Sequence, residues 1–588
     1  MKFLGNVLAV IVGIFVFTIL SILLFFGLIG IIAASGEKEV SLDDNTVLHL
    51  NLNGRVLVER TSEDDLNFGQ FGNPFGGSMQ AGMINLKKAI REAKTNEKIK
   101  GIYLNTGLIL AGQANLLELR EELESFKESG KFILAYDEAY GEGGYYLASV
   151  ADEIYLNPMG AIDFNGLASE VIFLKGFFEK VGIKPVVFRV GEFKSAVEPY
   201  ILEKMSPENR LQTEYFLEDI NQEMIKAVAD SRGLSLDSMA TINDQMLVRE
   251  AEDAVTYNLV NRLTYEDEVH AILREKLGLD EDDDIPTINA TDLGSLAKSK
   301  NLTSKNRIAV ILAEGEIVSG SVDGVISSDK FAKEIRKARK DDDIKAIVLR
   351  VNSPGGSILA SEVIWREMSE AKKVKPVYVS MGEVAASGGY YISAPADTIV
   401  AQPNTITGSI GIFGLWFNVQ ELINDKLGVT TDVVTTGELS DFMNVARPLT
   451  EVEKTIVQKS IEDGYEKFIS RVAEGRNMSP EAVKEVASGR VWTGNQAKER
   501  GLVDVLGGLD TTIDLAAKRI EAGDDYRVIY YPQQKPWFEK LMEDISDNVE
   551  ARILQAQLGE YYGLYQNLEK VKTYQGIQAR MPQEIKIK

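Results

Sequence analysis

The chain repeats itself, and this duplication restricts its possible folds more than any other feature. "IREAKTNEKIKGIYLN" from Ile90 corresponds to "IRKARKDDDIKAIVLR" from Ile335, a separation of 245 positions (335 minus 90). At the same separation, "GEGGYYLASVADEIYLNP" from Gly141 corresponds to "ASGGYYISAPADTIVAQP" from Ala386. Internal self-similarity means that one structural unit is built more than once. A chain of 588 residues is also too long for a single core, so we expect two related halves.

Changes in composition along the chain indicate the domain boundaries. We expect an N-terminal segment over 1–36, a first half over 37–284, a connector over 285–305, a second half over 306–530 and a C-terminal helical extension over 531–588. The connector is acidic and then rich in Ser and Asn, which is typical of surface segments. Within each half, short Val/Ile-rich runs alternate with segments of helical spacing. This alternation predicts an α/β fold with a parallel sheet.

The N-terminus carries a long apolar run, with no charged residue from Phe3 to Ala34. A transmembrane helix needs about 20 apolar residues, whereas the apolar region of a cleaved signal peptide has about 7–15. We therefore expect a retained transmembrane helix that anchors the chain in a lipid bilayer. Lys2 precedes the run, and the positive-inside bias then places the N-terminus in the cytoplasm. The expected location is the bacterial inner membrane, with the bulk of the chain in the periplasm.

Composition excludes several kinds of active site and partner. There is no cysteine, which excludes cysteine nucleophiles, thiolate zinc sites and disulfides. His49 and His270 are the two histidines, and neither has the setting that a Ser-His-Asp triad needs. The net charge of −24 argues against a nucleic-acid partner. A hydrolase of this composition would need a base other than histidine, and it would require no metal or cofactor.

Two segments of the second half have the pattern of a nucleophile and an oxyanion site. Ser387 lies in "AASGGYY", where Gly388 allows close backbone approach and brings its N–H beside the serine oxygen, as in a nucleophile elbow. "RVNSPGGS" over 350–357 follows a predicted strand, and its glycines suit a turn that exposes backbone N–H groups to an oxyanion. Taken alone, each segment also fits a structural role, as a small packing serine and an ordinary turn.

Comparison of the two halves favours the catalytic interpretation. Glu142 stands opposite Ser387, and the glycine-proline turn is "NTGLILAG" in the first half. Conversely, "FRVGEFKSAVEPY" pairs with "VVTTGELSDFMNV", and alignment of their shared "GE" (Gly191 with Gly437) puts Lys194 opposite Ser440. Each half lacks what the other carries. Although an isolated lysine is usually a surface residue, this complementarity predicts that Lys194 acts on Ser387.

These motifs resemble the signal peptide peptidase A family (peptidase family S49), in its long, duplicated, membrane-anchored form. The resemblance rests on "RVGEFKSAVEP", "RVNSPGGS", "MGEVAASGGYYIS", "PNTITGSIGIFG" and "VWTGNQAKERGLVD". It implies that Ser387 is the nucleophile, that Lys194 is the general base, and that Ser409 orients the lysine. Gly356 and Gly388 are the candidate oxyanion donors. The implied fold is two tandem domains of the crotonase and Clp protease type, built from ββα repeats.

The resemblance also implies a function: a membrane-anchored serine endopeptidase, assembled as a homotetramer, that degrades released signal peptides and other apolar peptides with a Ser-Lys dyad. A base near neutral pH needs a pKa of about 7–8, so Lys194 has to be desolvated, and Glu192 and Glu198 have to point elsewhere. Two alternatives remain open on the residues alone. One is a crotonase-like acyl-CoA enzyme, and the other is a catalytically inactive membrane scaffold of the same fold.

Overall fold

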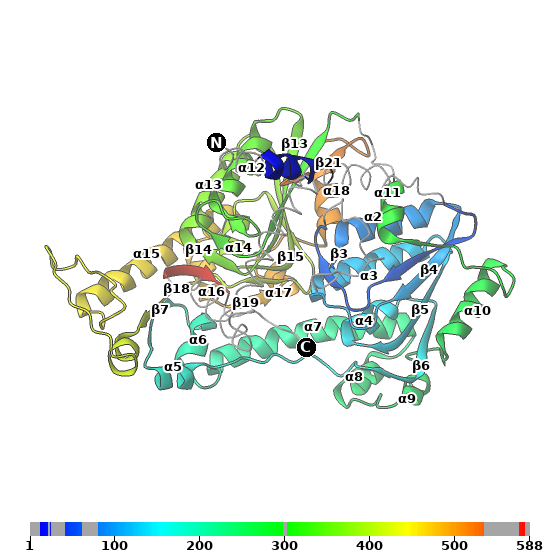
Figure 1. The fold of residues 1–588 in the computed structure, drawn as a ribbon, viewed down its shortest axis with the longest axis horizontal. Coiled ribbons are helices and arrows are strands. Elements are labelled where there is room, and N and C mark those ends of the chain that lie inside the picture. Colours follow the sequence, from blue (N-terminus) through cyan, green and yellow to red (C-terminus); the bar gives the residue numbers. More distant parts are fainter. Residues whose placement is uncertain are drawn as a thin grey trace, which may run out of the picture.

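The computed structural model describes residues 12–21, 24, 42–61, 80–297, 301, 303–533 and 576–581. Two α/β halves lie side by side in Figure 1, the first blue to green and the second green to orange. In each half a sheet of buried strands is flanked by helices. The predicted α/β class is therefore confirmed.

The first sheet has the strand order β8-β6-β5-β4-β1-β9, and all its neighbouring strands are parallel. Its strands are β1 (Thr46–Asn51), β4 (Ile99–Asn105), β5 (Phe132–Tyr140), β6 (Glu153–Ile162), β8 (Arg262–Leu263) and β9 (Thr287–Asn289). The helices of this half are α2 (Met83–Thr95), α3 (Gln113–Lys127), α4 (Glu142–Ala148), α5 (Lys175–Val181), α6 (Glu198–Ile201), α7 (Pro207–Arg232), α8 (Leu236–Asp244), α9 (Ala251–Thr256), α10 (Glu266–Leu277) and α11 (Ala290–Leu296). A separate two-stranded sheet consists of β2 (Val56–Val58) and β3 (Gln80–Gly82).

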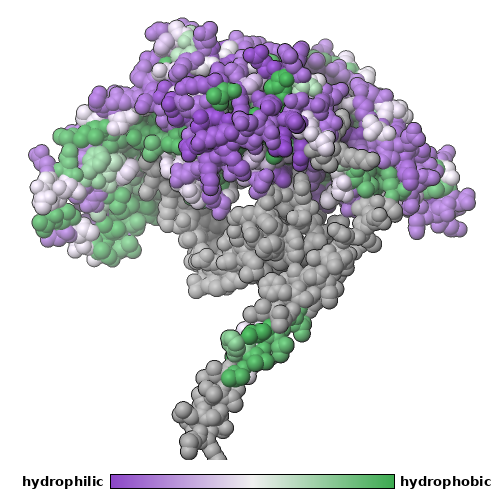
Figure 2. Space-filling model, turned by 90° about the horizontal axis from the view of Figure 1, so that it is seen from above, coloured by the Kyte–Doolittle hydropathy of each residue, from purple (hydrophilic) through white to green (hydrophobic). Residues whose placement is uncertain are grey.

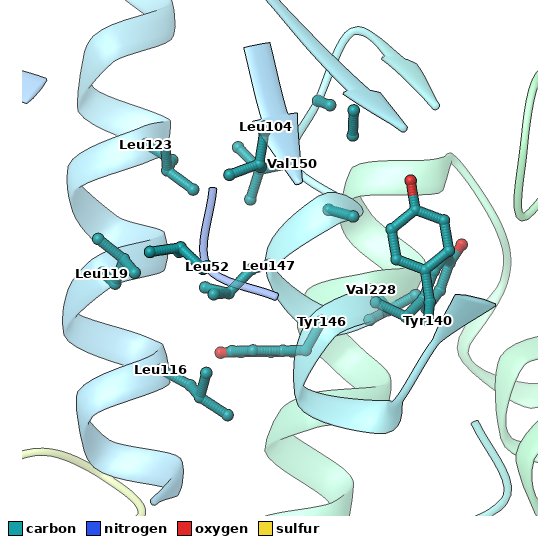
Figure 3. Close-up of a cluster of buried hydrophobic side chains, with 14 of the residues drawn as sticks. Leu52, Leu104, Leu116, Leu119, Leu123, Tyr140, Tyr146, Leu147, Val150 and Val228 are labelled. Carbon is teal, nitrogen blue, oxygen red and sulfur yellow. The ribbon is translucent and has the colours of Figure 1, made fainter. Parts of the chain in front are cut away.

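The core of the first half shows why these segments fold as they do. Leu116, Leu119 and Leu123 recur at helical spacing and lie along one face of α3. Figure 3 shows them pointing toward Leu52 and Leu147, and all five side chains are buried. Burial of this apolar face fixes α3 against the sheet.

The second sheet has the order β19-β17-β15-β13-β10-β21; β16 also pairs with β15, and β20 pairs with β16. Its strands are β10 (Arg307–Glu314), β13 (Ile344–Ser353), β15 (Val377–Ala386), β16 (Thr398–Ala401), β17 (Ile406–Gly408), β19 (Val491–Thr493), β20 (Val505–Leu506) and β21 (Arg527–Tyr531). Its helices are α12 (Ser328–Lys340), α13 (Ile358–Lys372), α14 (Gly388–Ser393), α15 (Glu451–Arg476), α16 (Pro480–Val486), α17 (Gly494–Glu499) and α18 (Leu509–Arg519). The duplication recurs in these elements, because α2 and α12 begin at 83 and 328 and α3 and α13 begin at 113 and 358.

A third sheet joins the halves. Its order is β12-β11-β14-β22-β18-β7, and its strands are β12 (Ile326–Ser327), β11 (Ile317–Val318), β14 (Gly355–Ser357), β22 (Gly576–Arg580), β18 (Ile412–Asn418) and β7 (Lys184–Val190). β7 comes from the first half and pairs antiparallel with β18 of the second, from Lys184 opposite Asn418 to Val190 opposite Ile412. This pairing delivers the residues after β7, including Lys194, into the second half.

The terminal segments and the connector are only partly described. The predicted transmembrane run over 3–34 is described at residues 12–21 and 24, where apolar side chains are exposed (Figure 2). Within the described ranges, no helix has both the length and the apolar character that a membrane crossing requires. The expected connector 285–305 contributes β9 and α11 to the first half, because β1 offers β9 a parallel edge. Of the predicted helical extension 531–588, residues 576–580 form the strand β22, and residues 534–575 and 582–588 lie outside the described part.

Candidate active site

Ser387 lies at a sharp junction between a strand and a helix. β15 ends at Ala386 and α14 begins at Gly388, so Ser387 alone makes the turn. Its φ of 55° and ψ of −111° are unusual for a residue other than glycine. Such strained backbone persists where the surrounding structure holds it, and it is concentrated at functional sites. Here Ser387 N–H donates to Gly408 O at 2.8 Å, and Tyr391 N–H donates to Ser387 O at 2.8 Å.

Lys194 of the first half reaches Ser387 within the same chain. The Lys194 Nζ lies 2.8 Å from Ser387 Oγ, and it lies 3.0 Å from both the backbone oxygen and the Oγ of Ser409. All three residues are fully buried. Burial lowers the pKa of Lys194 well below its usual value. No negative charge among the described residues acts to raise this pKa again. The structure thus brings the three predicted residues together around one amine.

The two neighbouring carboxylates point away from this amine. Glu198 is buried, and its Oε2 accepts hydrogen bonds from Asn209 Nδ2 at 3.0 Å and from Ser206 N–H at 3.2 Å. Its Oε1 lies 3.9 Å from Arg189 Nη1. Glu192 is exposed. Neither carboxylate is therefore placed to hold Lys194 in its charged form.

Two glycines of the second half leave room for Lys194. A Cβ on Gly489 would lie 2.7 Å from Lys194 Cβ, and a Cβ on Gly411 would lie 3.2 Å from Lys194 Cδ. Phe193 N–H also donates to Ser488 O at 3.0 Å, which fixes the backbone next to the lysine. Sequence reasoning missed these positions, because only the assembled halves show that both glycines approach Lys194.

The candidate oxyanion donors lie on two adjoining segments. Gly356 belongs to β14 and Gly388 begins α14. Gly355 has a φ of 99°, and a Cβ there would lie 2.7 Å from Gly388 N. A larger residue at Gly355 would thus push the two segments apart. The "PGG" turn in the sequence indicated only in part that this position has to be glycine. Gly388 directly follows Ser387, and Gly355 lies against its backbone nitrogen.

The corresponding corner of the first half is closed by its own carboxylate. Asp137 Oδ2 accepts hydrogen bonds from Thr106 N–H at 2.6 Å and from Gly107 N–H at 2.8 Å. Burial raises the pKa of Asp137 to about 7. Glu142, which takes the place of Ser387, receives hydrogen bonds from Gly166 N–H at 3.3 Å and Asn243 Nδ2 at 3.4 Å. In the first half, two N–H groups of the matching turn are therefore bound to a carboxylate, and Glu142 stands where the second half has the hydroxyl of Ser387.

A buried serine beside a desolvated amine and a glycine-rich corner is the arrangement that a serine hydrolase with an amine base requires. Comparison with known families supports a serine protease. The model of peptidase family S49 matches residues 125–280 and 369–523, one stretch in each half. The model of the Clp protease family matches residues 299–406, so the second half has a Clp protease-like fold.

Individual proteins are similar over most of the chain. "Protease 4" of Salmonella typhi is 36% identical over 531 residues, which cover 87% of this chain and 84% of that protein. "Serine protease SPPA, chloroplastic" of Arabidopsis thaliana is 32% identical and covers 83% of this chain and 72% of its own. "Putative signal peptide peptidase SppA" of Enterococcus faecium is 40% identical over 38% of this chain and 69% of its own. The chain belongs to peptidase family S49, which confirms the predicted family, and it is a serine protease that acts on peptides.

Proposed function

We propose that the protein is a membrane-anchored endopeptidase in which Ser387 is the nucleophile and Lys194 the general base. The observation that carries this proposal is the 2.8 Å distance between Lys194 Nζ and Ser387 Oγ in a fully buried setting. A lysine in water is protonated at neutral pH and cannot accept a proton. Burial without a carboxylate partner supports the neutral amine that a general base has to be.

The contacts of Lys194 also suit a neutral amine geometrically. A neutral amine has two N–H groups and one lone pair. The two oxygen atoms of Ser409, each 3.0 Å away, accept the two N–H groups. The lone pair then faces the hydroxyl of Ser387. Ser409 is thus proposed as a positioning residue that directs the base toward the nucleophile.

The proposed reaction follows from these placements. Lys194 takes the Ser387 proton as Oγ attacks the carbonyl carbon of a peptide bond. The N–H groups of Gly356 and Gly388 stabilise the negative oxygen that forms. Protonated Lys194 then gives its proton to the departing amine, and the C–N bond breaks. A water molecule, deprotonated by the same lysine, hydrolyses the acyl-enzyme and restores Ser387.

We further propose that the substrates are released signal peptides and other apolar peptides. The name of the Enterococcus faecium relative, "Putative signal peptide peptidase SppA", supports this substrate class. Membrane anchoring is supported by the apolar run from Phe3 to Ala34, of which residues 12–21 are helical with exposed apolar side chains. An anchored enzyme in the inner membrane, with its catalytic halves in the periplasm, would meet such peptides where they are released.

A homotetramer is proposed as the working form. The dyad is complete within one chain, so assembly is not needed to build it. An apolar face is nevertheless exposed in the segment after β18. Its exposed side chains are those of Leu427, Val429, Val433, Val434, Leu439 and Phe442. Figure 2 shows apolar side chains gathered at the end of the molecule that carries α15 in Figure 1. Contact between copies would remove such a surface from water.

The proposal is tested with the full chain purified in detergent and a synthetic signal peptide as substrate. Ser387→Ala and Lys194→Ala should each abolish cleavage. Lys184→Ala is a matched control, because Lys184 lies on β7 before Lys194 but is 69% exposed and pairs with Glu421. It should cleave at the normal rate. A mixture of the two inactive variants should stay inactive, because each dyad forms within one chain. Cleavage by either single variant would refute the assigned roles.

A further inference from the structure

The side chain of Glu383 crosses the boundary between the two halves and caps a helix of the first half. α3 begins after Gly112, which provides no side-chain cap for its first turn. Glu383 Oε2 accepts a hydrogen bond from Ala114 N–H at 3.0 Å, and its Oε1 accepts one from Asn115 N–H at 2.9 Å. A carboxylate at this end of a helix binds N–H groups that have no partner within the helix, and the helix dipole favours its charge. Figure 1 shows α3 beside β15 of the second half, which carries Glu383.

Glu383 lies in a bulge of the strand that leads to the nucleophile. Between two matched pairs of the ladder, β15 has three residues, 382–384, where β13 has only Asn352. The ladder with β13 therefore does not fix these three residues, and side chains hold them instead. Val384 N–H donates to Asn352 Oδ1 at 3.2 Å. Bulges next to active sites redirect the chain that follows them, and Ser387 comes four residues after Glu383.

α3 also holds the segment that leads to Ser409. The turn before β17 donates one hydrogen bond to the helix from Gln402 Nε2 to Glu121 Oε2 at 2.9 Å. A second bond runs from Asn404 Nδ2 to Gln113 O at 2.8 Å. β17 ends one residue before Ser409 and pairs with the end of β15. One helix of the first half is thus bonded to both segments that carry the serines of the site.

The duplication shows that the sheet itself does not require a buried carboxylate at this position. Glu138 occupies the matching position on β5, 245 residues earlier (383 minus 138), and it is exposed. Glu383 is partly buried, and burial raises the pKa of its carboxyl to about 7. A carboxylate that is kept from water close to an active site is typical of a functional group.

Charged groups on neighbouring elements also act on Glu383. Arg350 of β13 lowers the pKa of Glu383, and Glu59, which follows β2, raises it. On α3, Glu118 Oε1 lies 2.7 Å from Arg350 Nη2, and Glu121 accepts the hydrogen bond described above. The effect of burial on Glu383 is larger than that of these charges, so its carboxyl titrates near neutral pH.

We propose that Glu383 is a positioning residue of the active site: by binding the first turn of α3 it holds the end of β15, so that Ser387 keeps the backbone geometry in which Lys194 reaches its hydroxyl. This inference rests on the proposed catalytic role of Ser387. The first half then supplies the base and also fixes the nucleophile. Only the ionised carboxylate accepts with both oxygens, because a protonated carboxyl carries a hydrogen on one of them. Protonation of Glu383 below about pH 7 therefore frees one N–H group of α3 and weakens the hold on Ser387.

Glu383→Gln tests the inference, because the amide has a single oxygen acceptor, as the protonated carboxyl does. The full chain with this substitution should cleave a fluorogenic apolar peptide with a kcat about 10- to 100-fold lower and an unchanged KM, since misplacement of a reacting group lowers the rate. Glu138→Gln is the matched control on the duplicate strand, where the side chain is exposed. It should match the unaltered chain. A kcat of Glu383→Gln equal to that of the unaltered chain would overturn the inference.

The pH dependence of the loss is a readout that a merely structural role would not move. The ratio of kcat/KM between the unaltered chain and Glu383→Gln should be at most about twofold at about pH 5, where the carboxyl is protonated. It should rise to its full value at about pH 9, with a midpoint at about 7. Titration of Lys194 occurs in both forms and cancels in the ratio. A ratio that stays constant with pH would contradict the role of the ionised carboxylate.

A second variant covers the case in which Glu383→Gln harms folding. A Cβ on Gly112 would lie 2.1 Å from Glu383 Oε2, so Gly112→Ser displaces the carboxylate, and serine is itself a good cap for α3. Circular dichroism should match that of the unaltered chain, whereas kcat should fall as in Glu383→Gln. A normal kcat in Gly112→Ser would show that any cap of α3 is sufficient, and it would overturn the inference. Failure of the proposed peptidase activity would differ, because the unaltered chain and Glu138→Gln would then be inactive as well, and the inference would fall with it.

Discussion

Ser409→Ala tests how the lysine is held, because it removes one of the two oxygen atoms that lie 3.0 Å from Lys194 Nζ. A hydrogen bond to a neutral group contributes about 0.5–1.5 kcal/mol, and one to a charged group about 1.5–3 kcal/mol. Lys194 is neutral before the reaction and protonated in the transition state. The bond therefore favours the transition state by about 1–1.5 kcal/mol, and its loss should lower kcat about 5- to 13-fold.

The same difference has a second consequence, which a merely structural role would not produce. Because Ser409 Oγ stabilises the ammonium form more than the amine, its loss should lower the apparent pKa of Lys194 by about one unit. The pH profile of kcat/KM, measured with a fluorogenic peptide, should move to lower pH by this amount. Ser393→Ala is the control, because Ser393 is equally buried on α14 but its Oγ donates to Gly389 O at 2.7 Å. An unshifted profile in Ser409→Ala, or the same shift in the control, would refute the reasoning.

Three further predictions concern the base, the oxyanion corner and the contact between the halves. Since burial lowers the pKa of Lys194 and the neutral amine is the active form, kcat/KM of the unaltered chain should rise with pH and level off well below pH 10; a midpoint near 10 would contradict this. Gly356→Ala places a Cβ 2.1 Å from Ile317 O, so β14 has to move, and kcat should fall about 10²- to 10³-fold. Gly176→Ala, where a Cβ meets nothing within 4 Å, should leave kcat unchanged, and equal rates in both variants would exclude the assigned donor. Arg350→Met removes a buried guanidinium that lies 2.7 Å from Glu59 and from Glu118 of the first half. The two carboxylates lose their partner, so the free energy of unfolding should fall by about 3–5 kcal/mol and calorimetry should show a lower Tm. An unchanged Tm would show that these carboxylates do not need the guanidinium.

The alternation of apolar runs with helical segments was sufficient to predict one largely parallel sheet in each half, although β19 joins the second sheet antiparallel. β13 and α13 have the strong local patterns from which such predictions are made, and they match β4 and α3 of the first half at a separation of 245 residues. At matched positions the two halves carry different residue types, such as Glu142 opposite Ser387. This difference indicated Lys194 as the base without knowledge of any interatomic distance. The structure adds that these groups meet within one chain.

Other elements depend on partners that no local pattern reveals. β9 has three residues, too few for a period of two to show, and it is a strand because β1 offers it an edge. β22 lies in a stretch whose residue pattern predicted helix, and it is a strand because β14 and β18 pair with it on both sides. The crossing of β7 into the second half likewise requires the edge of β18, which is more than 200 residues away in the sequence. Long-range pairing of this kind overrides local propensity.

The central claim is that a neutral Lys194 activates Ser387 across the two halves of one chain. It is tested most directly by the rate at which a fluorophosphonate labels the protein as pH is varied, with the adduct located by mass spectrometry. The adduct should be on Ser387, the rate should rise with a midpoint well below pH 10, and Lys194→Ala should abolish labelling. An adduct on another serine, or equal labelling of Ser387 in Lys194→Ala, would contradict the account.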